Sequence, residues 1–339
     1  MTLVETLDPT SAPESSDVPR SIDPGLTTSD RAFHGIARSI GLLVLLITGS
    51  IGVFLGLQMI PTLQRYGMHF FIEHQWNPER DLIGISSVLI GTIIVALVAL
   101  VIAFPLALMT ALFITEYSPA RLRSTLIAAV DLMAAVPSII YGLWGFFLLQ
   151  SHAINLSRWI SQHFSWIPIF RVSTDPNAAS WQQSKYTNSM FIAGICVAMM
   201  VAPLATAVMR DVFAQAPLGE REGALALGST KWGMIRSVVL PFGRGGIIGG
   251  TMLGLGRALG ETVAVLLLLS QVFDIKFEIL SAGGVTVASL IANRFGEATA
   301  AQLSALLAAG FVLFMMTLVV NTIAAVIVNR SRSGAGVDI

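Results

Sequence analysis

Long apolar runs, separated by short polar stretches, dominate this sequence. A run of about 20 apolar residues can cross the roughly 30 Å hydrocarbon core of a bilayer as a helix. Hydrophobic residues make up 54% of the chain and charged residues only 12%, whereas a soluble domain typically carries about 25% charged residues. The pattern therefore predicts an all-α, polytopic membrane protein.

Six such runs define the expected transmembrane helices. They cover residues 36–60, 83–114, 124–150, 190–209, 245–270 and 300–328. Pro61 is expected to end the first span, and Pro137 to bend the third, because a proline removes a backbone donor and crowds the preceding turn. The predicted domain boundaries follow from these runs: a first helix with its outer connection over 34–82 and a transmembrane domain over 83–329.

The polar segments suggest an orientation. Residues 1–33 are rich in Ser, Thr, Pro and Asp and predict a disordered tail. Six spans place this tail, the 210–244 loop and the C-terminal residues 330–339 on one side. That side carries more Lys and Arg than the opposite connections, which are 61–82, 151–189 and 271–299. Basic residues favour the cytoplasm, so both termini are expected there. The 151–189 insert has no predicted role.

Several chemistries are excluded by what the sequence lacks. It contains no Gly-x-x-x-x-Gly-Lys-[Ser/Thr] motif and no Gly-Lys pair, so a phosphate-binding P-loop is absent. The single cysteine, Cys196, allows no internal disulfide, and the five histidines form no metal-binding pattern. The formal net charge of zero gives no indication of nucleic-acid binding. We expect no cofactor and no enzymatic reaction on this chain.

A polar stretch between the fourth and fifth spans, residues 222–241, has unusual local chemistry. It predicts two short helices, 223–227 and 231–239, joined by a turn at Gly228 and stopped before Pro241. The second helix is amphipathic, with Trp232, Ile235 and Val239 at helical spacing. A solvated loop with one half-buried helix would explain these features.

The spacing in this stretch resembles the EAA loop of ABC importer permeases. The matching positions are Glu222, Ala224, Gly228, Val238, Leu240 and Pro241, with Gly223 in place of the usual alanine and Val238 in place of isoleucine. The resemblance implies a cytoplasmic coupling helix that docks into a groove on a separate ATPase subunit.

Two charges interrupt the fifth span. Arg257 and Glu261 lie near its middle, and their four-residue spacing is expected to place them on one helical face. A charge at bilayer depth costs several kcal/mol, so such residues face a cavity or a partner. The guanidinium suits an oxyanion, and a neighbouring carboxylate can accept a hydrogen bond from a protonated anion such as phosphate. A self-neutralising ion pair is the structural alternative. Glycines 246, 250 and 254, then 256 and 260, predict close helix packing.

Three motifs together resemble phosphate ABC importer permeases of the PstC type: Gly-Leu-Gly-Arg-Ala-Leu-Gly-Glu-Thr at 254–262, Pro-Ser-Ile-Ile-Tyr-Gly-Leu-Trp-Gly at 137–145, and Phe-Ile-Thr-Glu-Tyr at 113–117. The resemblance implies a type I ABC importer fold in a bacterial cytoplasmic membrane. It also implies a sister PstA-type permease, a PstB-type ATPase dimer and an extracytoplasmic phosphate-binding protein. In that family an arginine and a glutamate at the positions of Arg257 and Glu261 are implicated in phosphate passage. A permease for molybdate or sulfate, or an ion-coupled secondary carrier, would also fit the missing P-loop.

Overall fold

The structure is a computed structural model that describes residues 28–172 and 184–331. Helices make up most of this part of the chain, as the sequence predicts. The named strands are short: β1 (Trp76–Asn77) and β2 (Leu82–Ile83) form an antiparallel hairpin in which Trp76 pairs with Ile83. Most of the predicted disordered tail, and residues 332–339 of the C-terminal segment, lie outside the described residues.

The α-helices, in chain order, are α1 (Thr28–Tyr66), α2 (His69–Ile72), α3 (Ser86–Leu112), α4 (Ala120–Ala135), α5 (Ser138–Trp144), α6 (Gln150–His163), α7 (Met190–Ala214), α8 (Leu218–Ala226), α9 (Lys231–Met234), α10 (Leu240–Phe242), α11 (Arg244–Leu259), α12 (Val263–Leu268), α13 (Val287–Arg294) and α14 (Ala300–Ser331). Single π-helical turns extend α3, α5 and α9 over Phe113–Tyr117, Gly145–Leu149 and Ile235–Val239.

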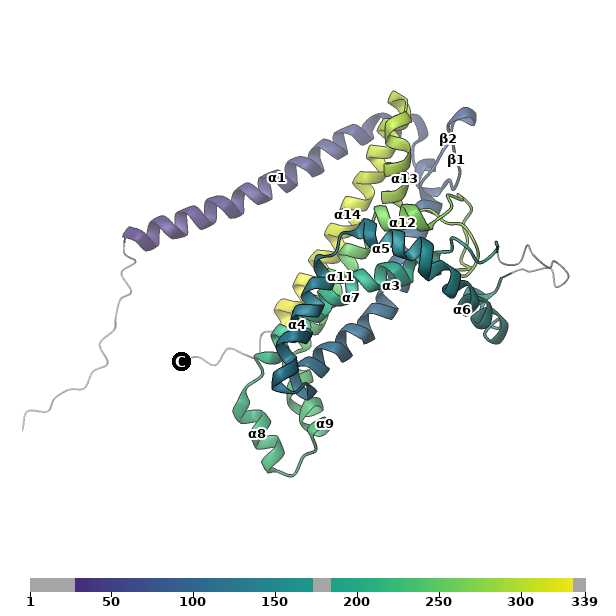
Figure 1. Cartoon of the computed structure of the whole chain (residues 1–339). Coiled ribbons are helices and arrows are strands. Elements are labelled where there is room, and N and C mark those ends of the chain that lie inside the picture. The colour runs from purple at the N-terminus through teal and green to yellow at the C-terminus, as the bar shows by residue number, and fades with distance from the viewer. Residues whose placement is uncertain (1–27, 173–183, 332–339) are drawn as a thin grey trace, which may run out of the picture. The chain divides into compact units, whose positions relative to one another are not determined.

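Five helical segments of the described chain are long and apolar enough to cross a membrane. A sixth span arises if the segment Lys231–Phe242 is taken together with α11, from which it is bent by 68°. The chain is therefore a multi-pass membrane protein, and six predicted spans agree with this count. Helices α3, α7, α11 and α14 pack in one bundle, with α8 and α9 at one end and the β1–β2 hairpin and α13 at the other (Figure 1).

The first span is longer than predicted at both ends. Helix α1 begins at Thr28, inside the segment expected to be disordered, and it continues through Pro61 to Tyr66. A proline in a helix removes one backbone hydrogen bond, but Pro61 does not end this helix. On its C-terminal part, Thr62 and Ser304 share a 2.8 Å hydrogen bond, which joins α1 to α14.

The third span has different boundaries from those predicted. Helix α4 ends at Ala135, and Val136 is extended with ψ of 130°, because the residue before a proline is driven out of the helical region. After Pro137, helix α5, its π-helical turn and α6 form a continuous segment, Ser138–His163, that has the length and composition of a span. The prediction that residues 151–163 belong to a polar insert is therefore wrong.

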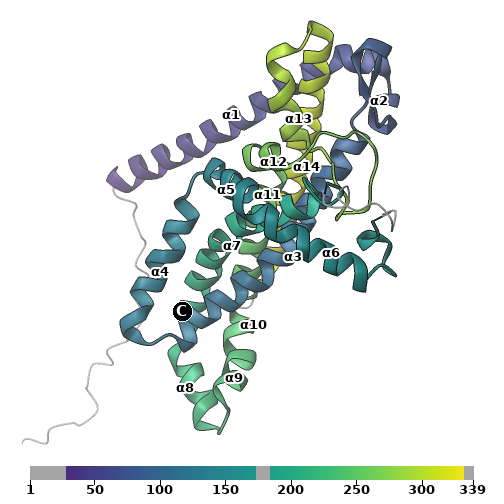
Figure 2. The same ribbon diagram turned by 45° about the vertical axis from the view of Figure 1, so that its right-hand side comes forward.

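The centre of the bundle is α7, which packs against both α3 and α11 (Figures 1 and 2). Helix α3 contributes a stripe of fully buried alanines at four-residue spacing: Ala99, Ala103, Ala107 and Ala111. Small side chains let helix backbones approach closely, which supplies the packing energy that the hydrophobic effect cannot supply in lipid.

Helix α11 reaches the other side of α7 through glycines. A Cβ atom added to Gly246 would lie 2.5 Å from Val212, one added to Gly254 would lie 2.5 Å from Val201, and one added to Gly250 would lie 3.0 Å from the carbonyl oxygen of Ala205. The predicted packing role of these three glycines is confirmed. Gly256 instead faces Asn321 of α14, and a Cβ at Gly260 would meet only backbone of its own segment.

We expect Gly246→Val to destabilise the bundle by about 1–3 kcal/mol, because the added side chain overpacks the α7–α11 contact. Gly249→Val is the matched control on the same helix, since a Cβ there meets only Val328 at 3.7 Å. The measurement is the midpoint of thermal unfolding in detergent, together with the amount of each variant in membranes. Equal midpoints for the two variants would contradict a close contact at Gly246.

Candidate coupling loop and substrate pathway

The polar stretch between α7 and α11 forms a helical projection at one end of the bundle, in which α8 and α9 lie side by side (Figures 1 and 2). Helix α8 buries none of its residues. By contrast, the segment that starts at α9 places Ile235 and Val239 fully inside, in a cluster with Phe213 of α7 and Leu112 of α3. The projection is thus anchored through α9, whereas α8 remains on its outside.

Gly228 ends α8 in the left-handed conformation, with φ of 83°. Its amide donates to the carbonyl of Leu225 at 3.0 Å, and the amide of Ser229 donates to the carbonyl of Ala224 at 3.1 Å. These two bonds form a Schellman motif, which satisfies carbonyls that the helix end would leave free and favours glycine at this position. The predicted turn at Gly228 is confirmed.

The second helix of the loop differs from the prediction in two ways. It does not stop before Pro241, because the π-helical turn at Ile235–Val239 leads into α10, which contains the proline near its start and ends before Gly243. Trp232 does not share the buried face with Ile235 and Val239, since it is 52% exposed.

The outer surface of the loop carries several exposed apolar side chains. Leu227, at the tip next to Gly228, is 91% exposed, and the other exposed large apolar side chains of α8 and α9 are Leu218, Leu225 and Trp232. Glu222 is exposed on the same helix, whereas Val238 and Leu240 are partly buried. An exposed apolar group rimmed by polar residues is the kind of surface that contacts another protein.

The Phe113–Tyr117 turn at the end of α3 contacts this loop. Arg221 of α8 places its Nη1 atom 3.1 Å from Oε1 of Glu116, whose side chain is only 4% exposed. Lys231 of α9 lies over the ring of Tyr117, with Nζ 4.9 Å from the ring centre. Arg123 of α4 donates to the carbonyls of Ile114 and Thr115 at 3.1 and 2.6 Å. Sequence reasoning treated this turn only as part of a motif and missed its contacts.

The fifth span is broken where its two charges lie. Helix α11 ends at Leu259, and Gly260 to Thr262 separate it from α12. Arg257 and Glu261 therefore do not share one helical face, and that expectation is wrong. Glu261 is 8% exposed, and its Oε1 accepts a long 3.4 Å hydrogen bond from the amide of Ala264. Arg257 is exposed in the isolated chain.

Each of these charges lies at a helix end of suitable polarity. Arg257 occupies the last turn of α11, where the helix dipole favours a cation, and Glu261 precedes the first turn of α12, where it favours an anion. The ion pairs among the described residues do not include one between them. Within the described residues, a self-neutralising pair is thus not what stabilises them.

The surroundings of the break combine close packing with a few polar atoms. Helix α5 approaches α12 at Gly142, where a Cβ would lie 2.9 Å from Cα of Ala264. Tyr141 donates from its hydroxyl to the carbonyl of Met133 at 2.9 Å, and Cys196 donates to the carbonyl of Tyr141 at 3.2 Å. The proline-containing motif at 137–145 therefore packs against α12, which begins directly after the motif at 254–262.

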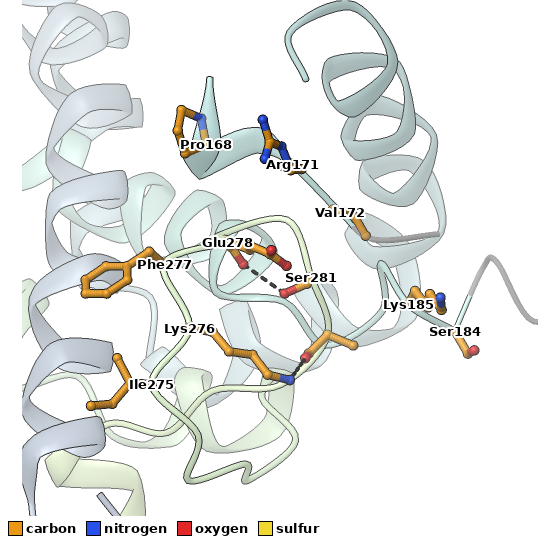
Figure 3. Close-up of a pocket in the computed structure, with 11 residues that line it drawn as sticks. Pro168, Arg171, Val172, Ser184, Lys185, Ile275, Lys276, Phe277, Glu278 and Ser281 are labelled. Atoms are coloured by element: carbon orange, nitrogen blue, oxygen red, sulfur yellow. Dashed lines mark hydrogen bonds between the residues drawn. The ribbon is translucent and has the colours of Figure 1, made fainter. Parts of the chain in front are cut away.

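A second candidate site lies at the opposite end of the bundle from α8 and α9. An open cavity of about 770 Å³ forms where the 271–299 connection meets the described residues near Arg171 and Lys185 (Figure 3). The two segments are joined by backbone bonds, from Ile279 to Ile169 at 3.1 Å and from Ala282 to Lys185 at 2.6 Å. The charged residues of the lining are Arg171, Lys185, Lys276 and Glu278. Three cations and one carboxylate give the cavity a net positive charge, which favours the approach of an anion.

Within the described residues, no group of three or more His, Cys, Asp or Glu side chains could hold a metal ion. The structure has two notable features: a broken helix that carries opposite charges, and a helical loop with an exposed apolar tip. Discontinuous helices of this kind hold substrates in membrane transporters. Fold and sites thus point to a membrane transport subunit.

Comparison with known proteins identifies the family. Residues 103–333 match the binding-protein-dependent transport system inner membrane components, and the chain belongs to this family. It is 37% identical over 309 residues to "Phosphate transport system permease protein PstC 2" of Mycobacterium tuberculosis, covering 90% of this chain and 93% of the relative. It is 38% identical over 290 residues to "Phosphate transport system permease protein PstC" of Xylella fastidiosa, covering 85% and 86%.

A solved structure confirms the fold. A bacterial ABC transporter involved in the import of the acidic polysaccharide alginate contains a chain that superposes with a TM-score of 0.55 at 21% identity, covering 88% of this chain and 99% of that chain. The predicted type I ABC importer permease fold is therefore confirmed.

Proposed function

We propose that this chain is a permease subunit of an ATP-driven importer that moves inorganic phosphate across the bacterial cytoplasmic membrane. The proposal that the substrate is phosphate rests on the similarity, over 85–90% of the chain, to relatives named as phosphate transport permeases. The geometry adds a reason from chemistry. Arg257 has no ion-pair partner among the described residues and offers donors to the phosphate oxygens, while the buried carboxylate of Glu261, close in sequence, offers an acceptor to the remaining proton of phosphate.

Arg257 and Glu261 are proposed to contact phosphate during its passage. Because each charge is favoured by its own helix terminus, neither requires the other, and both remain free to exchange partners as the anion passes. The break between α11 and α12 provides the irregular backbone that transporters use at substrate sites. The sister permease is expected to complete the pathway on the exposed side of Arg257.

ATP is proposed to act through other subunits. The exposed apolar tip around Leu227 and Trp232, with Glu222 beside it, would dock into a groove of a PstB-type ATPase. Closure of the ATPase dimer would move the loop, and the spans would alternate between outward and inward access. A PstA-type sister permease and an extracytoplasmic phosphate-binding protein complete the proposed assembly.

The orientation follows from the same assignment. The loop with α8 and α9 lies in the cytoplasm, both termini lie on that side, and the basic cavity at the other end faces outward. There its cations would attract the phosphate that the binding protein delivers.

We expect a cysteine at Ser281, in a Cys196→Ala background, to react with an impermeant thiol reagent in intact cells. Ser281 lines the basic cavity. A cysteine at Ser229, next to Gly228, is the matched control and should react only after the membrane is permeabilised. Labelling at Ser229 in intact cells would reverse the orientation and remove the docking assignment with it.

Gly228→Val is expected to weaken ATPase docking and ATP-driven uptake. A β-branched residue at φ of 83° costs about 1–3 kcal/mol of local strain. Gly223→Ala is the control, because it adds a methyl group to the same helix where nothing lies within 4 Å. The measurements are recovery of the ATPase with the purified permease and ATP hydrolysis by the complex. Wild-type values for Gly228→Val would leave the loop without a coupling role.

Arg257→Gln is expected to lower phosphate uptake by about 10- to 100-fold, because a hydrogen bond to a charged group contributes roughly 1.5–3 kcal/mol. The loss should persist in the Arg257→Gln, Glu261→Gln double variant, since the ion pairs of the described residues do not include one between these two charges. Arg257→Lys keeps the charge without the planar fork and should restore uptake only in part. Labelled phosphate uptake is measured in cells without other phosphate carriers, with molybdate and sulfate as competitors. Near-normal uptake by the double variant would exclude the pathway role.

A further inference from the structure

The Phe113–Tyr117 turn is the place where four helices are tied together by cations. Arg221 of α8 and Lys231 of α9 contact two adjacent side chains of this turn, Glu116 and Tyr117. Arg123 of α4 contacts its backbone. The turn itself continues α3. The two helices of the coupling loop thus each contribute one cation to the same end of one membrane span.

The chemistry of the turn explains why it collects cations. It is π-helical and closes with a 2.8 Å bond from the amide of Ser118 to the carbonyl of Phe113, and Pro119 then supplies no amide. The carbonyls of Ile114 and Thr115 would be left without donors, and Arg123 satisfies both. A helix C-terminus also attracts positive charge, and the buried carboxylate of Glu116 adds to that attraction.

Arg221 provides the polar tie between α8 and the membrane spans. Helix α8 buries no residue of its own, and its large apolar side chains, Leu218 and Leu225, are exposed. The guanidinium of Arg221, with a side chain that is 17% exposed, contacts Glu116 of α3 and also donates to the carbonyl of Phe213 at the end of α7. One side chain therefore connects the loop to both central spans.

The contact between Arg221 and Glu116 is an ion pair without a directed hydrogen bond. Nη1 of Arg221 lies 3.1 Å from Oε1 of Glu116. Within the described part of the chain, however, neither this oxygen nor Nε of Arg221 makes a hydrogen bond. Attraction between charges depends on distance and much less on angle. Such a contact can hold while the angle between α8 and α3 changes.

We propose that the Arg221–Glu116 pair is the joint through which movement of the coupling loop reaches α3, with Lys231 on Tyr117 as its second point of attachment. This proposal rests on the coupling role of the loop. Arg221 and Glu116 are positioning residues: they touch neither phosphate nor ATP, and they keep the end of α3 attached to α8 when the ATPase moves the loop.

The test uses the complete importer reconstituted with its ATPase and binding protein. Glu116→Gln and Arg221→Gln should leave the ATPase bound, while phosphate uptake and stimulation of ATP hydrolysis by the binding protein fall by about tenfold, the scale of a typical coupling free energy. The matched control is Asp131→Asn, which removes the 3.3 Å ion pair between Arg210 of α7 and α4 without touching α8. It should remain close to wild type.

Replacing the Arg221–Glu116 ion pair by a covalent crosslink distinguishes a contact that transmits movement from one that only stabilises the fold. In a Cys196→Ala background, a Glu116→Cys, Arg221→Cys variant should transport poorly, and a short bifunctional thiol reagent that links the two positions should restore uptake. Uptake that stays normal without the link, or stays low with it, would overturn the proposal. So would loss of the ATPase from the single variants, because Arg221 would then belong to the docking surface.

Failure of the coupling role itself gives a different result. In that case Gly228→Val complexes would hydrolyse ATP and transport normally. If only the joint is wrong, Gly228→Val still uncouples transport while Glu116→Gln and Arg221→Gln behave like Asp131→Asn. The amount of each variant in the membrane shows that it folds.

Discussion

The close approach of α7 to α3 and α11 is the contact on which the rest of the structure depends. Buried alanines of α3 line one side of α7, and three glycines of α11 line another. In lipid, association of helices relies on packing and on polar contacts, because lipid tails are as apolar as the side chains they would replace. This contact fixes the end of α11, where Arg257 lies, and the end of α3, where Glu116 lies.

Charged groups in and near the bundle are stabilised in two different ways. Arg257 and Glu261 use the ends of their own broken helix, so each is favoured without a fixed partner. Glu116, which is also buried, relies on Arg221 from another element. Removing one partner of a buried pair leaves an uncompensated charge, whereas a charge at a helix end can exchange partners. The first arrangement suits a passage for ions, and the second suits a mechanical connection.

Much of the fold could be predicted from the sequence, because apolar run length alone defines most spans. The turn at Gly228 was also predictable, since a glycine after a short helical stretch marks a left-handed C-terminus. The break at Gly260–Thr262 was not. A four-residue spacing of charges reads as one helical face unless tertiary packing interrupts the helix, and here α12 turns to pack against Gly142. The joint at Glu116 could not be found either, because the ion pair connects residues far apart in the chain.

The break between α11 and α12 also affects how the chain enters the bilayer. Sixteen helical residues reach only roughly 24 Å, short of the roughly 30 Å hydrocarbon core, and Arg257 in the last turn adds the cost of a charge at bilayer depth. We therefore expect α11 to insert poorly into the bilayer on its own. Helix α7 is synthesised earlier and presents the surface that the glycines of α11 fit. We therefore expect α7, which is already in the membrane, to assist the insertion of α11.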